Sequence, residues 1–391
     1  MILNIPDNAE ELGFSIKSDG YRSLIVPAKG TDLMNLTAWD DVSPWLRSVV
    51  VDSVTHDVLS SGLPKFWNLN QGDRNSGERL VEALLDPESK VYFTEKMDGS
   101  LVIRSVQNGE VNFRTRGTLD GGDMLPQILK VVEAEEYDWL LDPNLCSNHS
   151  LLFEYIGPEN RIVVPYQESD LVLIGCVNHT TMIQDTYEEL LCLTDVFNVN
   201  VVAHYSLPQS ISDLLDEVQA WEGREGIVIR VEHPTRYPET GGVWMVKLKA
   251  DDYLAKHRLR FSLTTRTIRE MCETAEISSW HQFEKVLADL GGDFEMAEQV
   301  RPMINLFIQV SRDADEILSA LFFQVEIALS EYPLRKDFAV KFANPLGQGS
   351  KIAFLLADNR PKDAFLALRK QMLDEAFKDL EAEDLEILGK T

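Results

Sequence analysis

The sequence predicts an α+β protein in which antiparallel sheets with flanking helices are followed by an all-helical C-terminal domain. Short runs that alternate between apolar and polar residues recur up to about residue 255, as strands do. From about residue 256 onward, apolar residues recur at helical spacing instead. The chain has 391 residues, 44% of them hydrophobic, which is enough for two packed domains. We therefore expect two domains, 1–258 and 259–391.

Several elements are predicted from spacing alone. Helices are expected in the first domain at 78–85, 125–142, 186–197 and 209–221. Helices are expected in the second domain at 267–274, 280–290, 295–310, 314–329 and 361–380. Two of the predicted strands, 46–52 and 161–164, include or border residues that become important below.

The chain is strongly acidic, which restricts the partners it can bind. Lys and Arg number 37 against 64 Asp and Glu, giving a net charge of −27. A protein that coats polyanions in general shows a broad basic stripe, and this composition argues against that class. A local basic cleft can still lie in an acidic body, so an enzyme that acts on nucleic acid stays compatible with the composition.

Cysteine usage and hydropathy indicate the compartment. The four cysteines lie far apart, with no Cys-x-x-Cys pair and no His cluster at zinc spacing; they are Cys146, Cys176, Cys192 and Cys272. We interpret them as buried core thiols in a reducing compartment. The N-terminus shows no signal peptide, and no apolar run is long enough to span a bilayer. We expect a soluble, cytoplasmic protein that binds no membrane.

Residues 95–100 (EKMDGS) form the first candidate motif, because they lie between two strand-like runs, 91–93 and 101–104. Asp-Gly is a favoured turn dipeptide, so one interpretation is a plain hairpin with Lys96 as a solvated edge charge. The other interpretation makes Lys96 a nucleophile at a strand end, with the turn leaving room for a nucleotide against the backbone. The segment alone leaves both interpretations open.

Charged side chains also stand on several other predicted strands. Glu154 lies within an apolar strand and Glu225 at a strand start, where an unpaired carboxylate costs stability. Lys247 and Lys249 share one strand face, where they repel each other unless an anion lies between them or solvent screens them. The full set of polar outliers is Arg47, Lys65, Lys96, Arg114, Arg116, Glu154, Glu225, Lys247 and Lys249.

This set combines several cations with two carboxylates, as a nucleotide-phosphate site with a divalent metal requires. Arg114 and Arg116 alternate along one predicted strand, so both project from one face, where we expect an anionic ligand. Arg47 lies near the start of another predicted strand. Lys65 is flanked by a Pro and two aromatic residues, so it either snorkels over the rings or takes part in the site.

Residues 96–100 (KMDGS) resemble the Lys-x-Asp-Gly nucleophile motif of the covalent nucleotidyltransferases, the superfamily of ligases and mRNA capping enzymes. The stretches 153–155 (FEY), 225–226 (EG) and 247–249 (KLK) follow in the order and rough spacing of the later motifs. Within the superfamily, the chain most resembles the bacteriophage ATP-dependent single-strand RNA ligases of the tRNA-repair type, the RNA ligase 1 family. That resemblance covers about residues 20–255 and rests on 47–49 (RSV), 64–68 (PKFWN), 114–117 (RTRG), 153–163 (FEYIGPENRIV) and 247–251 (KLKAD).

The resemblance implies an ATP-grasp-like nucleotidyltransferase fold for 1–258 and an RNA ligase that uses ATP with Mg²⁺, or with Mn²⁺ as the alternative ion. Lys96 would attack the α-phosphorus of ATP to form lysyl-AMP. AMP would then pass to an RNA 5′-phosphate, and a 3′-hydroxyl would displace it to join the strands. The implied partners are ATP and single-stranded RNA or cleaved tRNA ends, handled by a monomer in RNA repair. If the chain is phage-encoded, its place is the host cytoplasm.

The resemblance also implies a role for each matched residue. Lys247 would bind the α-phosphate, and Arg47 and Lys65 the departing phosphates. Glu154 would bind the ribose and Glu225 the metal. The expected catalytic residues are Lys96, Asp98, Lys247 and Lys249, of which Asp98 orients the nucleotide or a hydroxyl in the later steps. The expected cofactor-binding residues are Glu95, Lys96, Arg47, Lys65, Arg116, Gly117, Glu154, Lys247 and Lys249. Further candidates for phosphate contacts are Arg114, Arg116 and Lys249.

The helical half distinguishes between members of the superfamily. A DNA ligase or capping enzyme normally carries an oligonucleotide-binding β-barrel after the nucleotidyltransferase domain, whereas 259–391 shows helical spacing. An RNA ligase would use this domain for tRNA-end specificity, and otherwise it is an oligomerisation or stability module. Two other functions stay open, a capping-type guanylyltransferase that uses GTP and a non-catalytic protein that binds RNA ends.

Overall fold

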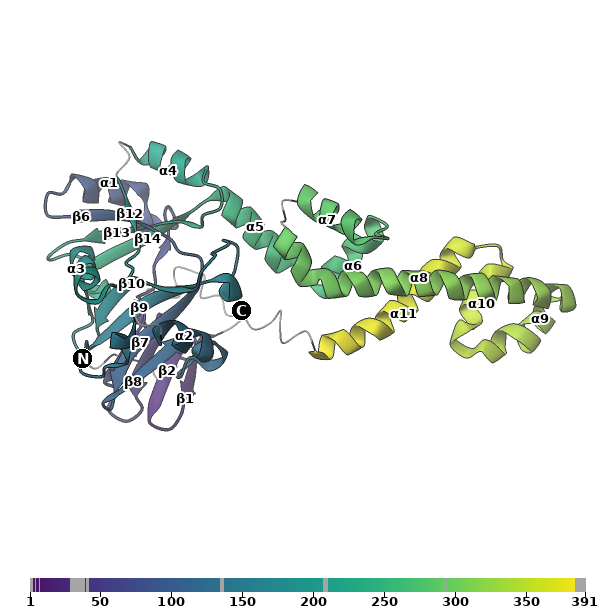
Figure 1. Cartoon of the computed structure of the whole chain (residues 1–391), viewed down its shortest axis with the longest axis horizontal. Helices are drawn as coiled ribbons and strands as arrows, with labels where there is room; N and C mark the ends of the chain where they lie inside the picture. The colour runs from purple at the N-terminus through teal and green to yellow at the C-terminus, as the bar shows by residue number, and fades with distance from the viewer. Residues whose placement is uncertain are drawn as a thin grey trace. The chain divides into compact units, whose positions relative to one another are not determined.

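The structure, a computed structural model, describes residues 3, 5–6, 8–28, 39, 42–133, 137–206, 210–290, 292 and 294–383. The chain divides into two compact units, Met1–His257 and Arg258–Thr391. Figure 1 shows the strands gathered in the first unit, whereas the described part of the second unit is drawn as helices. This confirms the predicted α+β class with a helical C-terminal half.

Three sheets make up the body of the first unit. The first sheet has the order β1-β2-β3-β4, the second β11-β10-β9-β7-β8, and the third β12-β6-β13-β14-β5. Strand β5 runs parallel to β14, and the other named pairs are antiparallel. The strands are β1 (Phe14–Ser18), β2 (Arg22–Pro27), β3 (Val49–Asp52), β4 (Val58–Ser61), β5 (Trp67–Asn68), β6 (Lys90–Glu95), β7 (Ser100–Gln107), β8 (Glu110–Thr115), β9 (His149–Ile156), β10 (Asp170–Asn178), β11 (Ile183–Gln184), β12 (His204–Tyr205), β13 (Gly226–Glu232) and β14 (Val243–Lys249).

Helices cover the second and third sheets. The apolar faces of α1 (Gly77–Leu85) and α4 (Ile211–Gln219) join the core of the third sheet, and those of α2 (Leu125–Val132) and α3 (Tyr187–Phe197) join the core of the second. Helices α1, α3 and α4 each begin where a Ser or Thr side chain accepts a hydrogen bond from the first turn. Such a cap satisfies a backbone donor that the helix itself leaves without a partner, which explains why these helices start where they do.

The predicted strand 46–52 is shorter than expected. Pro44–Arg47 forms a 3₁₀ helix, and only Val49–Asp52 is a strand. Pro44 favours a helical start at this point because its ring fixes φ and its missing N–H is not needed in a first turn. Arg47 therefore ends a 3₁₀ helix instead of lying on a strand.

A buried arginine accounts for a second difference. The predicted helix 125–142 is replaced by α2 and a separate 3₁₀ turn at Asp138–Leu141. Arg104 of β7 is fully buried, and its guanidinium donates to the carbonyl oxygens of Leu140, Asp142 and Leu145 at 3.1, 2.5 and 2.7 Å. These carbonyl oxygens accept from a side chain instead of from a continuing helix, and the loop is thereby tied to β7.

Arg114 is also buried, so the prediction that Arg114 and Arg116 share one ligand-facing surface is wrong. Arg114 is fully buried and donates to the hydroxyls of Ser60 and Ser48 at 2.9 and 2.8 Å, and to the Ser48 carbonyl oxygen at 3.2 Å. It thus joins the second sheet to the first, and burial lowers its pKa to about 9. Arg116 follows the end of β8 and is exposed.

The second unit is built around one long helix. Where two helices were predicted, α8 runs unbroken, because the residues between them include no Gly or Pro that would end it. One apolar cluster includes Ile268, Phe283 and Phe307, and another includes Val325, Phe338 and Ile352. The helices are α5 (Asp251–Ser262), which crosses into the second unit, α6 (Thr265–Thr274), α7 (Trp280–Asp289), α8 (Phe294–Glu331), α9 (Arg335–Phe338), α10 (Ser350–Ala357) and α11 (Pro361–Glu383).

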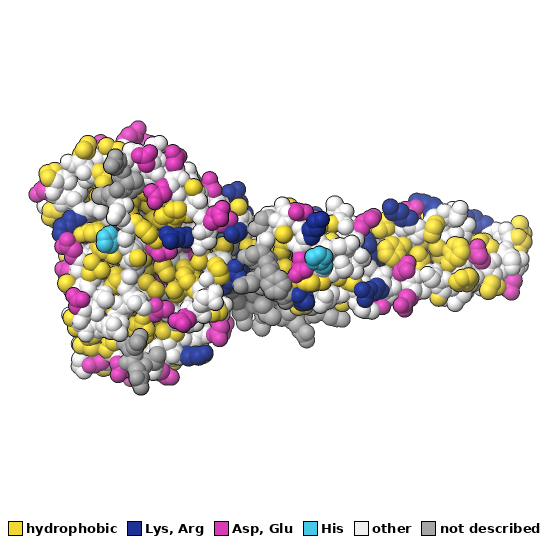
Figure 2. Space-filling view, turned by 45° about the horizontal axis from the view of Figure 1, so that its top comes forward, with side chains coloured by type: hydrophobic (Ala, Val, Ile, Leu, Met, Phe, Trp, Pro, Cys, Tyr) yellow, Lys and Arg dark blue, Asp and Glu magenta, His cyan; other side chains and the backbone are white. Residues whose placement is uncertain are grey.

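The surface agrees with the acidic composition. On the face that Figure 2 shows, the described Lys and Arg side chains form small separate groups between scattered acidic side chains. No helix in the described part of the chain is long and apolar enough to cross a membrane. The cysteines are free, but the interpretation as buried thiols is wrong for Cys192, which is exposed, and holds in part for Cys146, which is half-buried.

Replacing Arg104 with Met is expected to lower the free energy of unfolding by about 2–3 kcal/mol, because three carbonyl oxygens lose their donor. The measurement is urea unfolding of the full chain followed by circular dichroism. Lys90→Met is the matched control, since Lys90 is exposed on β6 and pairs with an exposed Glu188, a contact that contributes at most about 1 kcal/mol. Equal losses in the two variants would contradict the structural role of Arg104.

Candidate active site

The ends of three strands of the third sheet bring Lys96, Glu225 and Lys249 together. Lys96 follows β6, and its N–H donates to the carbonyl oxygen of Gly226 at 2.9 Å. Glu225 directly precedes β13, and the register pairs Gly226 with Lys249 on β14. One carboxylate oxygen of Glu225 lies 2.8 Å from Nζ of Lys96 and 2.8 Å from Nζ of Lys249. Glu225 is only 4% exposed, so a buried carboxylate bridges two ammonium groups.

Two glycines allow this close approach. Gly226 has φ of +143°, and a Cβ at this position would lie 2.1 Å from the carbonyl oxygen of Leu248. A Cβ on Gly99 would lie 2.2 Å from the carbonyl oxygen of Tyr155 on β9. Both distances are far below van der Waals contact. A side chain at Gly226 would push the start of β13 away from β14, and one at Gly99 would push the turn after Lys96 away from β9.

Further cations surround this bridge. Lys247 lies two residues before Lys249 on the same strand face. Burial, together with the charges of Arg47, Lys96, Lys249 and Lys65, lowers the pKa of Lys247 to about 7. Burial, together with Arg47 and Arg116, lowers the pKa of Lys65 to about 8. The residues that interact in this way, here called the cation cluster, are Arg47, Lys65, Lys96, Arg116, Lys247 and Lys249.

Aromatic rings separate some of these charges. The Arg47 guanidinium carbon lies 4.9 Å from the centre of the Phe66 ring, and Nζ of Lys247 lies 5.7 Å from the same centre. Nζ of Lys65 lies 4.1 Å from the centre of the Trp67 ring. Lys65 therefore lies over a ring and also interacts with the cation cluster, so the two interpretations of this residue do not exclude each other. Its part in catalysis stays a prediction. Ring faces attract cations and partly offset the repulsion between them.

Glu154 is the second carboxylate at the site. It stands on β9 opposite Leu101 of β7, and it is half-buried. Burial raises the pKa of the Glu154 carboxyl to about 7, although the charges of Lys96 and Arg47 act in the opposite direction. This carboxyl therefore exists in both protonation states near neutral pH, and it can accept or donate a hydrogen bond to a bound hydroxyl.

Asp98 holds protein groups in this structure. It is 1% exposed, and one carboxylate oxygen accepts from the N–H groups of Val163 and Val164 at 2.7 and 2.8 Å. The other oxygen accepts from the hydroxyl of Tyr253 on α5 at 2.9 Å. The strand predicted at 161–164 does not form, since these backbone donors bind a side chain instead of a neighbouring strand.

Three predicted site residues make contacts outside this constellation. The Glu95 carboxylate accepts from the hydroxyl of Tyr205 at 2.9 Å, and the Gly117 carbonyl oxygen accepts from Nζ of Lys17 at 2.8 Å. Arg114 lies in the interior, as described above. Sequence reasoning also missed Phe66 and Tyr253 as parts of the site, because an aromatic residue carries no charge signal that separates a site position from a core position.

The donors at this site fit the expected nucleotide and metal. Half-buried ammonium and guanidinium groups provide the positive charge that a triphosphate needs. Glu225 and Glu154 offer carboxylate oxygens, the ligands that Mg²⁺ and Mn²⁺ prefer. Binding of a cation by Glu225 would require this carboxylate to leave at least one of its two lysine partners.

The raised pKa of Glu154 makes the stability of the protein depend on pH. In the unfolded chain this carboxyl titrates near 4.5, and in the folded chain at about 7. The folded state binds the proton more tightly, so this contribution to stability is complete below pH 4.5 and is lost as pH rises through 7. Glu154→Gln removes this titrating group. As pH rises from 4.5 to 8, the variant should therefore gain on the order of 1–2 kcal/mol in free energy of unfolding relative to wild type.

Thermal unfolding of both proteins across this pH range measures the difference. Glu217→Gln, at an exposed position on α4, serves as the control and should follow the wild-type curve. Parallel curves for wild type and Glu154→Gln would show that the carboxyl is not perturbed.

Comparison with known proteins places the first unit in a family. Residues 46–253, more than half of the chain, match the family model described as RNA ligase. A Thermovibrio ammonificans protein assigned as an RNA ligase is 25% identical over 230 residues, which are 56% of this chain and 53% of that protein. RNA ligase 1 of bacteriophage TS2126 is 28% identical over 167 residues, 41% of each chain.

The chain therefore spans about half the length of these curated relatives, or less. Among solved structures, an archaeal ATP-dependent RNA ligase aligns with a TM-score of 0.47 at 16% identity, covering 79% of this chain and 80% of that one. The match of the family model over more than half of the sequence, which includes Lys96, Glu154, Glu225 and Lys247, decides the assignment. The chain belongs to the RNA ligase family.

Proposed function

We propose that the chain is an ATP-dependent RNA ligase that joins an RNA 5′-phosphate to a 3′-hydroxyl through lysyl-AMP and adenylylated RNA. The observation that carries the proposal is the position of Lys96 at the edge of the cation cluster, 2.8 Å from the buried Glu225 carboxylate. A primary amine beside several phosphate-binding cations is the arrangement that attack on a nucleoside triphosphate needs. Family membership supports the same activity.

Lys96 has to be neutral when it attacks, because only the free amine has the lone pair that forms the new bond. A divalent cation held by Glu225, and by Glu154 where its carboxyl is ionised, would neutralise phosphate charge. Such a cation would also compete with Lys96 for the Glu225 carboxylate, which pairs with this lysine in the free protein.

The remaining cations bind the phosphates. Lys247, in the middle of the cluster, is assigned to the α-phosphate, where negative charge develops as the amine attacks. Arg47 and Lys65 are assigned to the β- and γ-phosphates that leave as pyrophosphate, and Arg116 and Lys249 provide further contacts. Glu154 binds a ribose hydroxyl. Asp98 stabilises the turn after Lys96, and its role in orienting the nucleotide during the later steps stays a prediction.

The RNA substrate is proposed to be single-stranded RNA or cleaved tRNA, with the helical unit contributing recognition of the ends. The net charge of −27 argues against broad RNA binding, so contacts should concentrate near the joined ends. The four free cysteines fit a reducing compartment, and we propose that the protein acts in the cytoplasm as a monomer with Mg²⁺ or Mn²⁺.

Mass spectrometry of the intact protein after incubation with ATP and Mg²⁺ tests the first step. We expect a covalent AMP adduct in wild type, no adduct in Lys96→Ala, and no GMP adduct with GTP. Lys90→Ala is the matched control, because Lys90 lies on the same strand, is exposed, and pairs with Glu188 away from the site; it should keep the adduct. Folded wild type that forms no adduct with ATP would refute the ligase proposal, and an adduct with GTP would favour a capping-type enzyme.

Removal of Lys247 should separate stability from activity. Its pKa is near 10.5 in the unfolded chain and about 7 in the folded one, so its charge destabilises the folded protein at low pH. Stability from this group therefore rises between pH 7 and 10.5. Lys247→Met should lack this cost, be more stable than wild type below pH 7, and lose that advantage by about pH 10.5.

The same variant should form the AMP adduct at least about 100-fold more slowly, because the α-phosphate loses its cation. Thermal unfolding across pH and the rate of adduct formation are the two measurements. A variant that is less stable than wild type at pH 6 would show that the charge of Lys247 does not destabilise the folded protein.

A further inference from the structure

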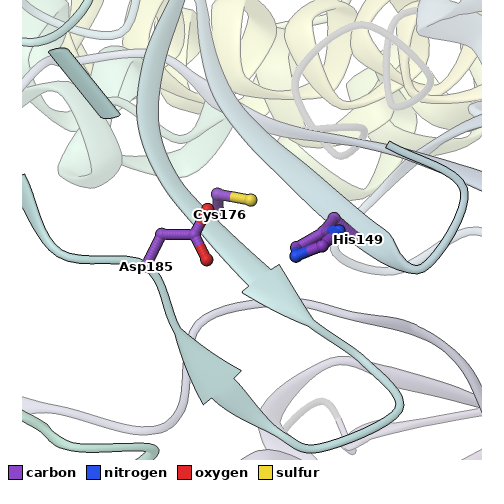
Figure 3. A group of neighbouring side chains, drawn as sticks. All are labelled: His149, Cys176 and Asp185. Atoms are coloured by element: carbon purple, nitrogen blue, oxygen red, sulfur yellow. The ribbon is translucent and has the colours of Figure 1, made fainter. Parts of the chain in front are cut away.

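A second group of polar side chains lies in the second sheet, away from the cation cluster residues. Figure 3 shows His149, Cys176 and Asp185 directed toward one another from neighbouring strands. One candidate ligand atom from each residue lies within 4.8 Å of those of the other two. The proposed nucleotide chemistry uses none of the three.

Strand register explains how they meet. Cys176 of β10 stands opposite Leu151 of β9, and His149 lies two residues before Leu151, so both side chains occupy the same face of the sheet. Asp185 follows β11, which pairs with β10 through Gln184. The three side chains therefore come from three adjacent strands.

The backbone around these residues is held in place. The N–H of Asp185 donates to the carbonyl oxygen of Cys176 at 3.0 Å, and the Asp185 carbonyl oxygen accepts from Arg230. The N–H of His149 donates to the carbonyl oxygen of Cys146 at 3.0 Å. The loop that ends at Cys146 is in turn tied to β7 by Arg104, as described above. Such fixed positions are what a metal site needs from its ligands.

Two simpler explanations fit less well. A nucleophilic Cys176 is excluded, because the residue is 2% exposed and burial beside Asp185 raises the pKa of its thiol. A closed hydrogen-bonded group would use the ring of His149, yet neither of its nitrogens makes a hydrogen bond to any residue that the structure describes. A nitrogen, a thiol and a carboxylate at the edge of an apolar core instead match the mixed ligands of Zn²⁺.

A similar group elsewhere shows why grouping alone is not sufficient. Asp86, Glu88 and His233 also lie close together. Nδ1 of His233 accepts from the N–H groups of Thr235 and Arg236 at 3.1 Å each, so Nε2 carries the proton and has no lone pair for a metal. The backbone thus fixes His233 in the tautomer that cannot bind a metal through Nε2, whereas no hydrogen bond to a described residue fixes the tautomer of His149.

We propose that His149, Cys176 and Asp185 bind one Zn²⁺ in the first unit, with solvent as the fourth ligand. Binding forms a Zn–S bond to Cys176 and releases the thiol proton to solvent. The ion would tie the start of β9 to β10 and to the segment after β11. Because β9 also carries Glu154, the site would brace the strand that presents this carboxyl. The inference does not depend on the proposed ligase activity.

Cobalt titration of the full-length protein tests the site. Co²⁺ substitutes for Zn²⁺, and a thiolate ligand gives a charge-transfer absorption band that the oxygen ligands of the nucleotide site cannot produce. We expect one equivalent of Co²⁺ to produce this band and Zn²⁺ to abolish it by displacement. Cys176→Ser should lack the band. Cys192→Ser, which removes the exposed cysteine of α3, is the matched control and should keep it.

Circular dichroism establishes that each variant is folded. A folded wild type without the band, or a folded Cys176→Ser protein with it, overturns the proposal. If Cys176→Ser does not fold, His149→Gln decides the question, since loss of a ligand should weaken Co²⁺ binding at least about tenfold and an unchanged affinity overturns the site. Lys96→Ala should retain the band, so failure of AMP transfer and failure of metal binding are distinguishable.

Discussion

The buried Glu225 carboxylate between Lys96 and Lys249 is the interaction on which the site depends. A lone carboxylate at 4% exposure would be costly, and two ammonium groups at 2.8 Å provide the partners that make its burial tolerable. The same contact sets the position of both lysines at the strand ends. Removing Glu225 would leave both ammonium groups without this partner, whereas removing one lysine leaves the carboxylate paired with the other.

The cation cluster has the opposite character, because its charges do not satisfy one another. Burial is the main cause of the lowered pKa values of Lys247 and Lys65, and the neighbouring positive charges add to it, so the folded chain holds these charges at a cost. The arrangement persists because apolar packing elsewhere in the sheets stabilises the strands that carry it. An anion that binds between these cations reduces their repulsion, so the charge arrangement of the free protein favours phosphate binding.

Sequence patterns predicted the parts of the site that strand geometry alone can bring together. Lys96, Glu225 and Lys249 lie at strand ends that meet in one sheet, and each is a charged residue in a strand context. Arg114 carries the same signal but is held by Ser48 and Ser60, partners far away in sequence that no local pattern reveals.

The same limit applies to backbone structure. The helix expected at 125–142 is interrupted where Arg104 binds the carbonyl oxygens of a loop, and the strand expected at 161–164 is replaced by hydrogen bonds to Asp98. In both cases a side chain from a distant strand competes with local hydrogen bonding and prevails. Helical spacing identified the second unit well, because its elements depend on local periodicity, although it divided α8 in two. The role of that unit stays a prediction.

The hydrogen bond from Tyr253 to Asp98 has a mechanical consequence for the whole chain. Tyr253 lies in the first turn of α5, and α5 continues past His257 into the second unit. Asp98 thereby anchors the start of this connecting helix to the turn that follows Lys96. A displacement of this turn would therefore be passed to the first turn of α5.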